Sequence, residues 1–441
     1  MAGSRVFSTT CPYWRAGAVT SFGPVRIRVG TFSPHRMNPA STPKPSPINV
    51  LFILNSLCVG GAEKQVISLI NRIDRSRYAT SLLYLKQADD LLAQIDPGSC
   101  PHGLRCLGVK KGIEWSAIRQ IARHIVDHRI DIVVCTNMYA LLYGWLARRL
   151  SGRGVRLVEV FHTTHIDSRK ERLWMGIYRP VIRRTDLLVY VCRNQAAHWR
   201  RHGLRPRQDA VIHNGIDTQR FEDVWSVDDK IAVRRQHGFA AADYVVGLCA
   251  VMRPEKAHTD LLDAIARLRG QGVDIKGLLI GGGPDRPRVD AQIRALGLGD
   301  HVRVTGLIQD VRPAMAACDV MVLTTRTGET FSLSALEAMA LGKPMVMTDI
   351  GGASEQVTHG ENGWLYPAGD TQALAECLRA LSDARLRATA GSKAARRVAE
   401  EFDVGGMVKG YERTLSALMV SGVKAQSANP AADPSARAGS R

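Results

Sequence analysis

Residues 244–283 read YVVGLCAVMRPEKAHTDLLDAIARLRGQGVDIKGLLIGGG. The stretch opens with an apolar run rich in β-branched residues, and a similar run, IKGLLI, follows at 275–280. Between the two runs Thr259 is a suitable N-terminal cap for a helix. Leucine and isoleucine then recur every three or four residues, as on one helix face: Leu261, Leu262, Ile265 and Leu268. A strand, a helix and a second strand predict a parallel βαβ unit.

The same alternation of apolar run and amphipathic helix extends over most of the chain. Runs that are apolar on both faces are typical of parallel strands covered by helices on both sides. They recur in the first half at 48–54, 130–135, 155–161, 187–192 and 210–213, and in the second half at 244–251, 275–280, 301–305, 320–324 and 344–348. The pattern breaks at the polar stretch 218–243. The fold class predicted is α/β, with two Rossmann-like, doubly wound domains facing across a cleft.

The two ends of the chain differ in composition from the rest. Residues 1–47 carry six basic and no acidic side chains and are rich in Ser, Pro and Gly. Such a segment cannot bury a core, and no apolar stretch of a secretory signal follows its arginines. We expect a disordered or non-native extension, the latter with Met37 as the true start, and an organelle transit peptide is a third interpretation. Residues 421–441 are predicted to be a disordered tail.

Composition excludes several classes of protein. Hydrophobic residues make up 45% and charged residues 23% of the 441 residues, which is ordinary globular usage. No window approaches about 18 uninterrupted apolar residues, so a membrane-spanning helix is not expected. The nine cysteines are scattered without a Cys-x-x-Cys pair. This predicts reduced thiols in the cytoplasm, and neither a disulfide framework nor a zinc site.

The net charge of +18 is concentrated in the first half of the chain. Residues 48–220 carry 27 basic and 14 acidic side chains, whereas residues 221–420 carry 23 basic and 26 acidic ones. The asymmetry indicates that only the first half meets an anionic partner. Nucleic acid, an anionic bilayer and a phosphate-bearing substrate at a bilayer are candidates, and solubility alone is the simplest interpretation.

The strongest local motif is ETFSLSALEAMALGKP at 329–344, which follows the apolar run 320–324. A helix is predicted to begin near Ser332 or Ser334, and the free amides and positive dipole of a helix start bind phosphate. Glu329, just before it, would repel phosphate and should face a neutral, hydroxyl-bearing group. Glu337, one to two turns in, would accept hydrogen bonds from a ribose diol. The layout suggests a nucleotide-sugar, although two solvated helix acids would give the same spacing.

Two cations, Arg253 and Lys256, follow the strand 244–251, at the sheet edge where ligands of this fold bind. They would neutralise a diphosphate and stabilise it as it leaves, and an ordinary charged surface loop is the alternative. Gly281–Gly283 after the next strand permits close backbone approach to a ligand, or simply makes a tight turn.

In the first half, Gly60 and Gly61 lie at a strand-to-helix corner, and His162 ends the strand 155–161. Both positions are where a ligand of this fold lies, and both also have plain structural explanations. No Asp-x-Asp pair and no cluster of His, Cys and carboxylates offers metal-ligand spacing. No metal and no cofactor is therefore expected.

In this order the motifs resemble glycosyltransferase family 4, the group 1 transferases with a GT-B fold. The resemblance runs from about Ile48 to Leu418. It rests on Gly60-Gly61-Ala62-Glu63, His162, His213-Asn214-Gly215-Ile216-Asp217, Arg253-Pro254-Glu255-Lys256, Gly281-Gly282-Gly283-Pro284, and Glu329 to Glu337.

The resemblance implies a role for each matching residue. His162 and Glu329 would be catalytic and contact the transferred sugar, with Phe331 beside it. Glu337 would hold the ribose. The donor diphosphate would be bound by Gly60, Gly61, Arg253, Lys256, Ser332 and Leu333. The family retains the anomeric configuration, needs no metal and reacts on the front face of the donor.

The resemblance also implies the division of the chain. Residues 48–217 would form the acceptor-binding domain, 218–402 the donor-binding domain, and 403–420 a helix that crosses back to the first domain. Two departures affect the site. The family's usual arginine stands at the position of Val251, so Arg253 would take over its contact or the phosphate would rest mainly on Lys256. Thr330 and Ser332 replace two usual glycines, which would narrow the sugar site.

The function predicted is transfer of a sugar from a nucleotide-diphosphate-sugar to a saccharide or lipid-linked acceptor in surface polysaccharide or glycolipid synthesis. The enzyme would be cytoplasmic, with a possible peripheral membrane contact through 169–184, where Leu173, Trp174, Ile177 and Tyr178 lie among basic residues. A buried helix with one solvated side explains that segment equally well. The rival functions are a sugar-nucleotide epimerase of the same architecture and a basic nucleic-acid-binding protein. The second lacks a recognised motif and has only 6% aromatic residues for stacking.

Overall fold

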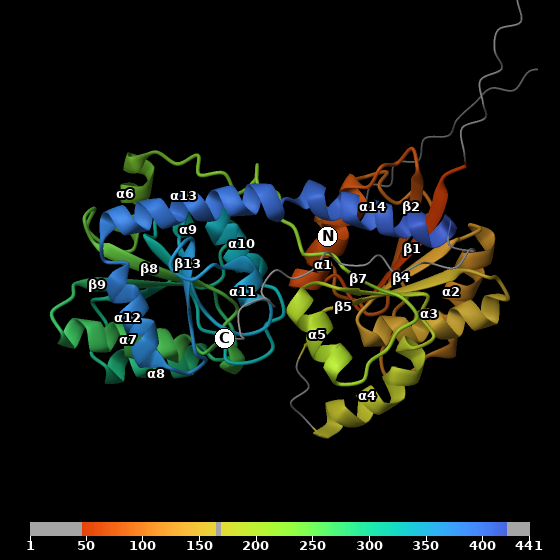
Figure 1. Cartoon of the computed structure of the whole chain (residues 1–441), viewed down its shortest axis with the longest axis horizontal. Helices are drawn as coiled ribbons and strands as arrows, with labels where there is room; N and C mark the ends of the chain where they lie inside the picture. Colours follow the sequence, from red (N-terminus) through yellow and green to blue (C-terminus); the bar gives the residue numbers. More distant parts are fainter. Residues whose placement is uncertain (1–45, 165–168, 421–441) are drawn as a thin grey trace, which may run out of the picture. The chain divides into compact units, whose positions relative to one another are not determined.

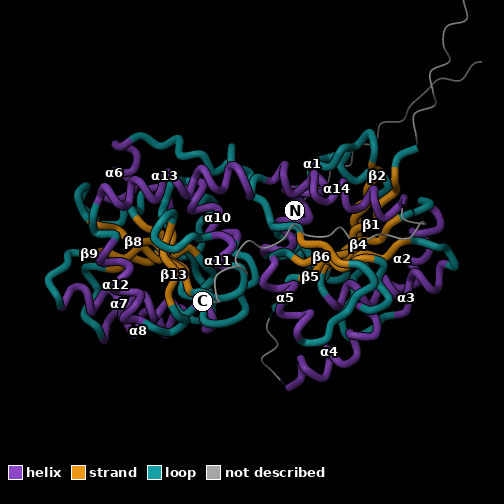
Figure 2. The backbone as a smooth tube through the Cα atoms, in the orientation of Figure 1, coloured by secondary structure: helices purple, strands orange, loops and turns teal. Residues whose placement is uncertain are grey.

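The computed structural model describes residues 46–164 and 169–420, with the backbone alone for 169–172. The predictions for residues 1–45 and for the tail at 421–441 lie outside the described residues. The described chain contains two parallel β-sheets, each covered by helices on both faces (Figures 1 and 2). The predicted fold class of two doubly wound α/β domains is confirmed.

The first sheet has seven parallel strands in the order β3-β2-β1-β4-β5-β6-β7. The direction of winding reverses between β1 and β4, which is the kind of switch point where ligands bind in open α/β sheets. The strands are β1 (Ile48–Leu54), β2 (Tyr78–Tyr84), β3 (Leu104–Cys106), β4 (Ile132–Thr136), β5 (Arg156–Phe161), β6 (Leu187–Tyr190) and β7 (Asp209–Val211).

Successive side chains of β1 alternate between two cores, as the pleat of a strand requires. Phe52 packs toward α1 (Gly61–Arg72) and α14 (Val404–Val420), whereas Leu51 packs toward the opposite face. That face is covered by α2 (Trp115–Asp127), α3 (Met138–Ser151), α4 (Arg169–Ile182) and α5 (Arg193–Arg201). A short 3-10 helix, η1 (Leu92–Gln94), follows β2. We call this sheet with α1–α5 and α14 the first lobe.

The second sheet has six parallel strands in the order β10-β9-β8-β11-β12-β13 and, with its helices, forms the second lobe. The strands are β8 (Tyr244–Cys249), β9 (Ile275–Ile280), β10 (Val302–Val304), β11 (Val320–Leu323), β12 (Met345–Thr348) and β13 (Gly363–Tyr366). Helices α7 (His258–Gly270), α8 (Arg286–Ala295) and α12 (Thr371–Ala380) cover one face, and α9 (Arg312–Ala316), α10 (Leu333–Ala340) and α13 (Ala384–Glu401) the other (Figure 1). The remaining elements are α6 (Val227–Gln236), η2 (Pro254–Lys256) and α11 (Ala353–Gln356).

The two passages of the chain between the lobes lie side by side. The Ile216 amide donates to the Phe402 carbonyl over 3.0 Å, and the Val404 amide donates to the Ile216 carbonyl over 2.8 Å. Gln65 of α1 grips the backbone of Gly215 with both atoms of its side-chain amide, at 2.9 and 3.0 Å. A Cβ on Gly215 would lie 2.8 Å from the Val404 Cα, so this position accepts only glycine without a shift of the backbone.

Helix α14 packs on the first lobe although it ends the described chain. Tyr78 donates from its hydroxyl to the Glu412 carbonyl over 2.7 Å, and Glu412 accepts from the Asp74 amide over 2.9 Å. Its apolar face joins the core that also contains Phe52 and Ile67. The first lobe is therefore built from both ends of the described chain.

Some details differ from the sequence-based expectations. Thr259 does not cap α7, because the helix begins at His258 and Thr259 lies in its first turn; the N-cap is Ala257, in a left-handed conformation with φ of 44° and no side-chain cap. The polar stretch 218–243 contains α6, which a reciprocal capping box between Ser226 and Asp229 begins. Strands β2, β3 and β13 were not among the predicted runs, because serine, threonine or charged residues interrupt them or they are very short.

Candidate functional site

The predicted phosphate site is the start of α10. Ser332 is its N-cap, and the Ser332 hydroxyl accepts from the Ala335 amide over 3.3 Å. Gln356 binds both backbone groups of Ser332, so the Ser332 amide is occupied at 3.2 Å from Oε1. Within the described residues, the amides of Leu333 and Ser334 donate no hydrogen bond. Of the two residues predicted to hold the diphosphate here, Leu333 has a free amide and Ser332 does not.

Lys256 and Glu329 lie together at this edge of the second sheet. The Lys256 ammonium is 2.6 Å from Glu329 Oε2, with both side chains mostly buried. Two hydrogen bonds join their loops: the Thr324 hydroxyl donates to the Lys256 carbonyl over 2.7 Å, and the Arg326 amide donates to the Glu255 carbonyl over 2.8 Å. The pairing neutralises Glu329, which the sequence suggested would otherwise repel a phosphate.

Arg253 lies on the same loop but is far less engaged. Its side chain is 61% exposed, and its guanidinium is 4.0 Å from Glu255. Val251, at the position of the family's usual arginine, is 43% exposed. The two candidate cations are therefore unequal, since Lys256 is held by a close ion pair and Arg253 is mostly exposed.

Glu337 lies one turn into α10 with its side chain only 12% exposed. Burial raises the pKa of the Glu337 carboxyl above its usual value, against the opposing effect of Lys64 and Arg220. Lys64, in the first turn of α1, is 4.0 Å from Glu337 and reaches it from the first lobe. Lys64 and Arg220 were not predicted as site residues, although a lysine three residues after Gly61 in a ligand-facing helix start was a usable signal.

Gly60 and Gly61 lie at the corner between β1 and α1, as predicted. Gly60 is the N-cap of α1, and a Cβ built on Gly61 would lie 3.5 Å from Leu333 Cδ1 in α10. The two helix starts, one from each lobe, are therefore in contact. Burial raises the pKa of Glu63, which follows the glycine pair.

His162 follows β5 and is bonded to the second lobe through its backbone. The Thr330 hydroxyl donates to the His162 carbonyl over 2.7 Å and lies 2.8 Å from the Thr164 hydroxyl. Burial lowers the pKa of His162 to about 4, so its imidazole is neutral near pH 7. Its Nε2 has no hydrogen-bond partner within the described residues. A neutral ring whose Nε2 has no partner among these residues is suited to a sugar hydroxyl.

Phe331 is buried and its ring does not face open space. It stacks on His213 with centroids 5.1 Å apart and meets Phe402 edge-on at 5.5 Å. Its carbonyl accepts from the Asn214 side-chain amide over 3.4 Å. Any contact of Phe331 with a sugar would therefore be made by its backbone, while its ring joins the lobes.

The HNGID motif at 213–217 belongs to the junction between the lobes. His213 Nε2 lies 2.8 Å from Glu355 Oε2. The same carboxylate of α11 accepts from the amides of Arg193 and Asn194 in the first turn of α5, at 2.9 and 2.7 Å. Burial would raise the pKa of Glu355, but the hydrogen bonds from His213, Asn194 and Arg193 outweigh it and hold the pKa below its usual value.

The triple glycine after β9 has a structural explanation. Gly281 and Gly283 have φ of 137° and 156°, and a Cβ on either would lie within 2.4 Å of the carbonyl oxygen of Ala250 or Met252. The Met252 amide also donates to the Gly282 carbonyl over 2.9 Å. The glycines let this loop lie against residues 250–252, directly before Arg253.

The segment 169–184 contains α4, which ends at Ile182 and has two apolar faces. Met175, Tyr178, Val181 and Ile182 are buried against the first sheet, whereas Leu173, Trp174 and Ile177 are 72%, 42% and 50% exposed. Tyr178, predicted to belong to a membrane-facing surface, is therefore a core residue. No helix among residues 46–164 and 169–420 is both long and apolar enough to cross a bilayer, and these ranges contain no group of three metal-ligating side chains.

The two lobes match two different family models of known proteins. Residues 59–220 match the family described as Glycosyltransferase Family 4, and residues 243–384 match Glycosyl transferases group 1. The phosphatidyl-myo-inositol mannosyltransferase of Mycobacterium leprae is 30% identical over 319 residues, covering 70% of this chain and 79% of that protein. The N-acetyl-alpha-D-glucosaminyl L-malate synthase of Bacillus anthracis is 28% identical over 293 residues, covering 65% and 75%.

Among solved structures, Anabaena Alr3699/HepE in complex with UDP superimposes with a TM-score of 0.72 at 26% identity, covering 84% of this chain and 100% of that one. The same Anabaena protein has also been solved with UDP-glucose. The resemblance that the motifs suggested is confirmed: the chain belongs to the group 1 glycosyltransferases of family 4 and has the GT-B fold.

Proposed function

We propose that this glycosyltransferase moves a sugar, with retention of anomeric configuration and without a metal, from a nucleotide-diphosphate-sugar to a saccharide or lipid-linked acceptor. The product would belong to a surface polysaccharide or glycolipid. The observation that carries the donor assignment is the start of α10, where free amides, the Lys256–Glu329 pair and the buried Glu337 follow one another. The UDP and UDP-glucose complexes of the Anabaena protein support the same donor class.

The donor would lie across the start of α10. Its diphosphate would accept a hydrogen bond from the Leu333 amide and pair with the Lys256 ammonium. Its ribose hydroxyls would donate to Glu337, and its sugar hydroxyls would donate to Glu329. Lys256 would exchange part of its contact with Glu329 for phosphate oxygens, which would leave the carboxylate free to accept from the sugar. Arg253 would add a weaker, solvent-screened contact, because its side chain is 61% exposed.

In the reaction, the bond between the anomeric carbon and the β-phosphate oxygen breaks, and its electron pair stays on the phosphate. The acceptor oxygen forms the new bond on the same face, and its proton passes to the departing phosphate. Charge therefore grows on the diphosphate as it leaves, where Lys256 and the helix dipole stabilise it more than in the ground state. Neutral His162 would hold the sugar by a hydroxyl.

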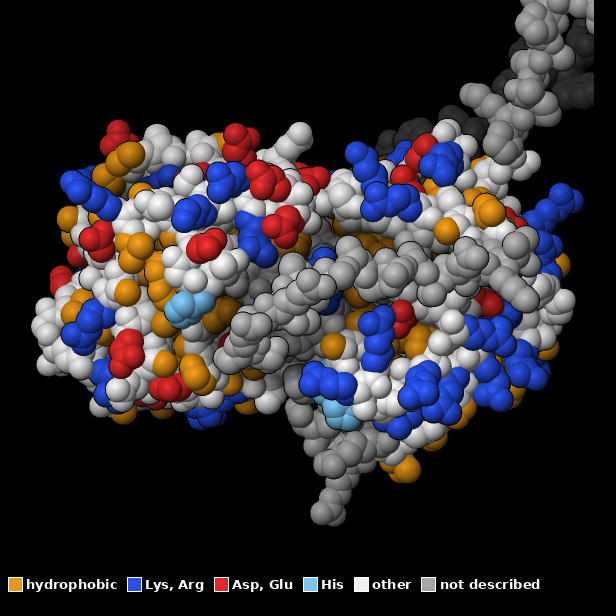
Figure 3. Space-filling view, in the orientation of Figure 1, with side chains coloured by type: hydrophobic (Ala, Val, Ile, Leu, Met, Phe, Trp, Pro, Cys, Tyr) orange, Lys and Arg blue, Asp and Glu red, His pale blue; other side chains and the backbone are white. Residues whose placement is uncertain are grey.

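The acceptor would be bound by residues 48–217, with the enzyme resting on the cytoplasmic face of a membrane through α4. Leu173, Trp174 and Ile177 supply an exposed apolar group there. Figure 3 shows lysine and arginine side chains gathering over the region of α2, α3 and α4, which suits an anionic surface.

The decisive experiment measures thermal shifts with a panel of nucleotide-sugars. We expect the wild type to be stabilised by at least one of them, Lys256→Ala and Glu337→Gln to lose the shift, and Arg253→Ala to keep most of it. Lys393→Ala, which removes an exposed lysine of α13, serves as the control. Equal thermal shifts in the wild type, Lys256→Ala and Glu337→Gln would show that the donor does not bind at this position.

Two further measurements test the chemistry. Transfer should persist in a chelator, and the anomeric proton of the product should show the configuration of the donor by NMR. Turnover of the donor without any acceptor would instead support the epimerase. The membrane contact is tested by flotation with anionic vesicles: the double variant Leu173→Ser/Ile177→Ser should lose binding, whereas Val224→Ser/Val227→Ser, at residues 71% and 73% exposed in the second lobe, should keep it.

A further inference from the structure

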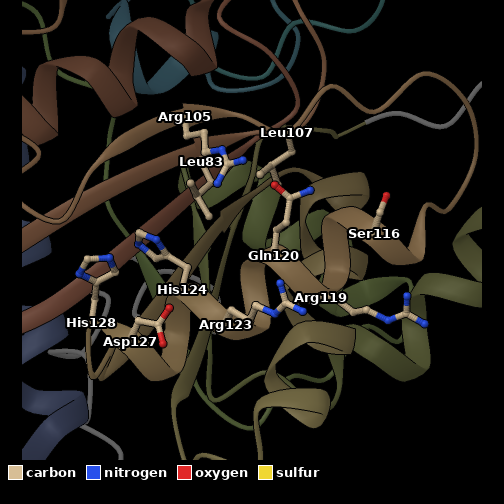
Figure 4. A pocket seen from close by; sticks show the side chains of 10 residues that line it. All are labelled: Leu83, Arg105, Leu107, Ser116, Arg119, Gln120, Arg123, His124, Asp127 and His128. Carbon is tan, nitrogen blue, oxygen red and sulfur yellow. The ribbon is translucent and has the colours of Figure 1, made fainter.

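A pocket of about 620 Å³ lies on the first lobe, and none of the donor-site residues named above lines it. It opens between α2 and the ends of β2 and β3 (Figure 4). A volume of this size is in the range of small-molecule sites. The lining residues are Leu83, Arg105, Leu107, Ser116, Arg119, Gln120, Arg123, His124, Asp127 and His128.

The edge of the first sheet creates this hollow. Leu83 of β2 is paired with Arg105 of β3, so the two side chains leave the same face of the sheet. Leu83 is buried in the core beneath α2, but β3 is the last strand and has only three residues. No strand of the described chain lies beyond Arg105 on this edge of the sheet, so the face over β3 stays open.

The other wall of the pocket is one polar stripe of α2. Its members are spaced three or four residues apart, so they share one side of the helix. They are Ser116, Arg119, Gln120, Arg123, His124 and Asp127, while the opposite side buries Ala117, Ile118, Ile121, Ala122 and Ile125. Figure 4 shows Arg105 reaching in from the sheet and Arg119 and Arg123 extending from the helix.

The charges of this pocket are not compensated. Within the described residues, the guanidinium groups of Arg105, Arg119 and Arg123 form no ion pair and no hydrogen bond, and Asp127 is the one carboxylate among the lining residues. Elsewhere in the same lobe, Arg148 and Arg200 each bind an aspartate at 2.8 and 2.7 Å. A guanidinium group is planar and permanently charged, and it can donate two parallel hydrogen bonds to the oxygens of one phosphate.

Two histidines, His124 and His128, line the far end of the pocket. His124 Nε2 lies 2.9 Å from the Ser81 hydroxyl, and its ring is 4.4 Å from that of His128. Burial, reinforced by His128 and His102, lowers the pKa of His124 to about 4. The His124 imidazole is therefore neutral near pH 7 and is held in place by the serine, whereas the arginines carry positive charge.

We propose that this pocket binds a phosphate-bearing ligand at a second site, independent of the sugar donor. Arg105 on one wall and Arg119 and Arg123 on the other hold the phosphoryl oxygens, and Gln120 and Ser116 donate to neighbouring oxygens of the ligand. The same chemistry fits a small phosphorylated metabolite and the phosphoryl headgroup of an anionic lipid.

Titration calorimetry with inorganic pyrophosphate tests the site. Lys256→Ala is introduced first in the full chain, so that the donor site contributes little. In that background, Arg119→Gln/Arg123→Gln should weaken pyrophosphate binding by about tenfold or more, since charge-assisted hydrogen bonds are lost. The matched control Arg288→Gln/Arg294→Gln removes two exposed arginines of α8 and should leave binding unchanged. All four side chains are exposed, and circular dichroism checks that each variant folds.

A second arm separates the two sources of phosphate. Vesicles of phosphatidylcholine with phosphatidylglycerol are compared with pyrophosphate, and Leu173→Ser/Ile177→Ser removes the contribution of α4. Arginine-dependent binding of pyrophosphate assigns a soluble ligand, and arginine-dependent binding of the vesicles alone assigns a lipid headgroup. If neither probe depends on Arg119 and Arg123, the pocket is not a phosphate site.

Discussion

Glu159 is a carboxylic acid in an environment that disfavours its charged form. It lies in the middle of β5, fully buried, and neither carboxylate oxygen has a hydrogen-bond partner within the described residues. Burial raises the pKa of this carboxyl well above its usual value. The folded protein therefore keeps a proton on Glu159 at pH values where the unfolded chain, with a pKa of about 4.3, has lost it.

The contribution of Glu159 to the free energy of unfolding should consequently fall as pH rises. The loss begins near pH 4.3 and continues up to the raised pKa of the folded state, with a slope of up to about 1.4 kcal/mol per pH unit. Glu159→Gln removes the titration, so its stability should exceed that of the wild type increasingly toward pH 8. Urea unfolding at several pH values measures this, with the exposed Glu400→Gln as the control. Parallel curves for the wild type and Glu159→Gln would contradict the expectation.

Individual site residues were predictable only as far as their backbone positions. The strand ends placed Lys256 and Glu329 at one edge of a sheet, but their 2.6 Å ion pair depends on two loops that the sequence does not align. Phe331 was chosen for its place in the motif, and its ring packs on His213 instead. Lys64 escaped prediction because its partner, Glu337, comes from the other lobe.

Helix α11 shows how a short element can join two larger ones. Its Glu355 carboxylate caps the first turn of α5 and also binds His213. An anion at a helix start is favoured by the free amides and by the dipole. Because the pKa of Glu355 is held below its usual value, this stabilisation is present above about pH 4.3 and is lost as pH falls through the folded-state pKa.

Glu355→Gln should therefore lower the free energy of unfolding by about 1–2 kcal/mol near neutral pH. The difference from the wild type should shrink in acid, where both side chains are neutral. Urea midpoints at pH 7 and at a series of pH values descending below about 4.3 measure it, and Glu361→Gln, at an exposed neighbouring position, is the matched control. A difference that stays constant through the whole series would mean that the charge of Glu355 contributes little.

Elements with long apolar runs were predicted well, and short or mixed ones were not. The runs at 48–54 and 275–280 are strands with the same bounds in the structure. Strand β2, YATSLLY, has polar residues among its apolar ones, and only its position between β1 and β3 buries them. Helix α6 begins with a capping box but has no buried residue, so hydrophobic periodicity could not reveal it.

At the scale of the whole molecule, Thr330 is the point where one side chain ties the second lobe to the end of β5. Its hydroxyl serves both the His162 carbonyl and the Thr164 hydroxyl, and its own carbonyl accepts from Cys192. The resemblance pointed to a glycine at this position and to a narrowed sugar site. The contact between lobes could not be foreseen, because it joins residues about 170 apart in sequence.

Thr330→Val keeps the shape of the side chain and removes both hydrogen bonds. We expect the free energy of unfolding to fall by about 1–3 kcal/mol and kcat/KM for transfer to fall with it, because the lobes lose a fixed alignment at His162. Thr348→Val is the control, since that buried hydroxyl bonds the Thr325 carbonyl within the second lobe. If the two variants lose the same stability and retain the same kcat/KM, the contact does not align the lobes for transfer.

The return of α14 to the first lobe has a consequence for how the protein is made. A ribosome delivers Phe52 and Ile67 early, yet the helix that shields their side of the sheet, through Tyr411 and Leu415, emerges some 350 residues later. During that interval the nascent first lobe exposes a hydrophobic surface. The length of the interval is set by the rate of synthesis, about 5–20 residues per second. Chaperones should therefore bind the nascent chain until α14 leaves the exit tunnel. A stalled chain that lacks α14 should continue to bind them.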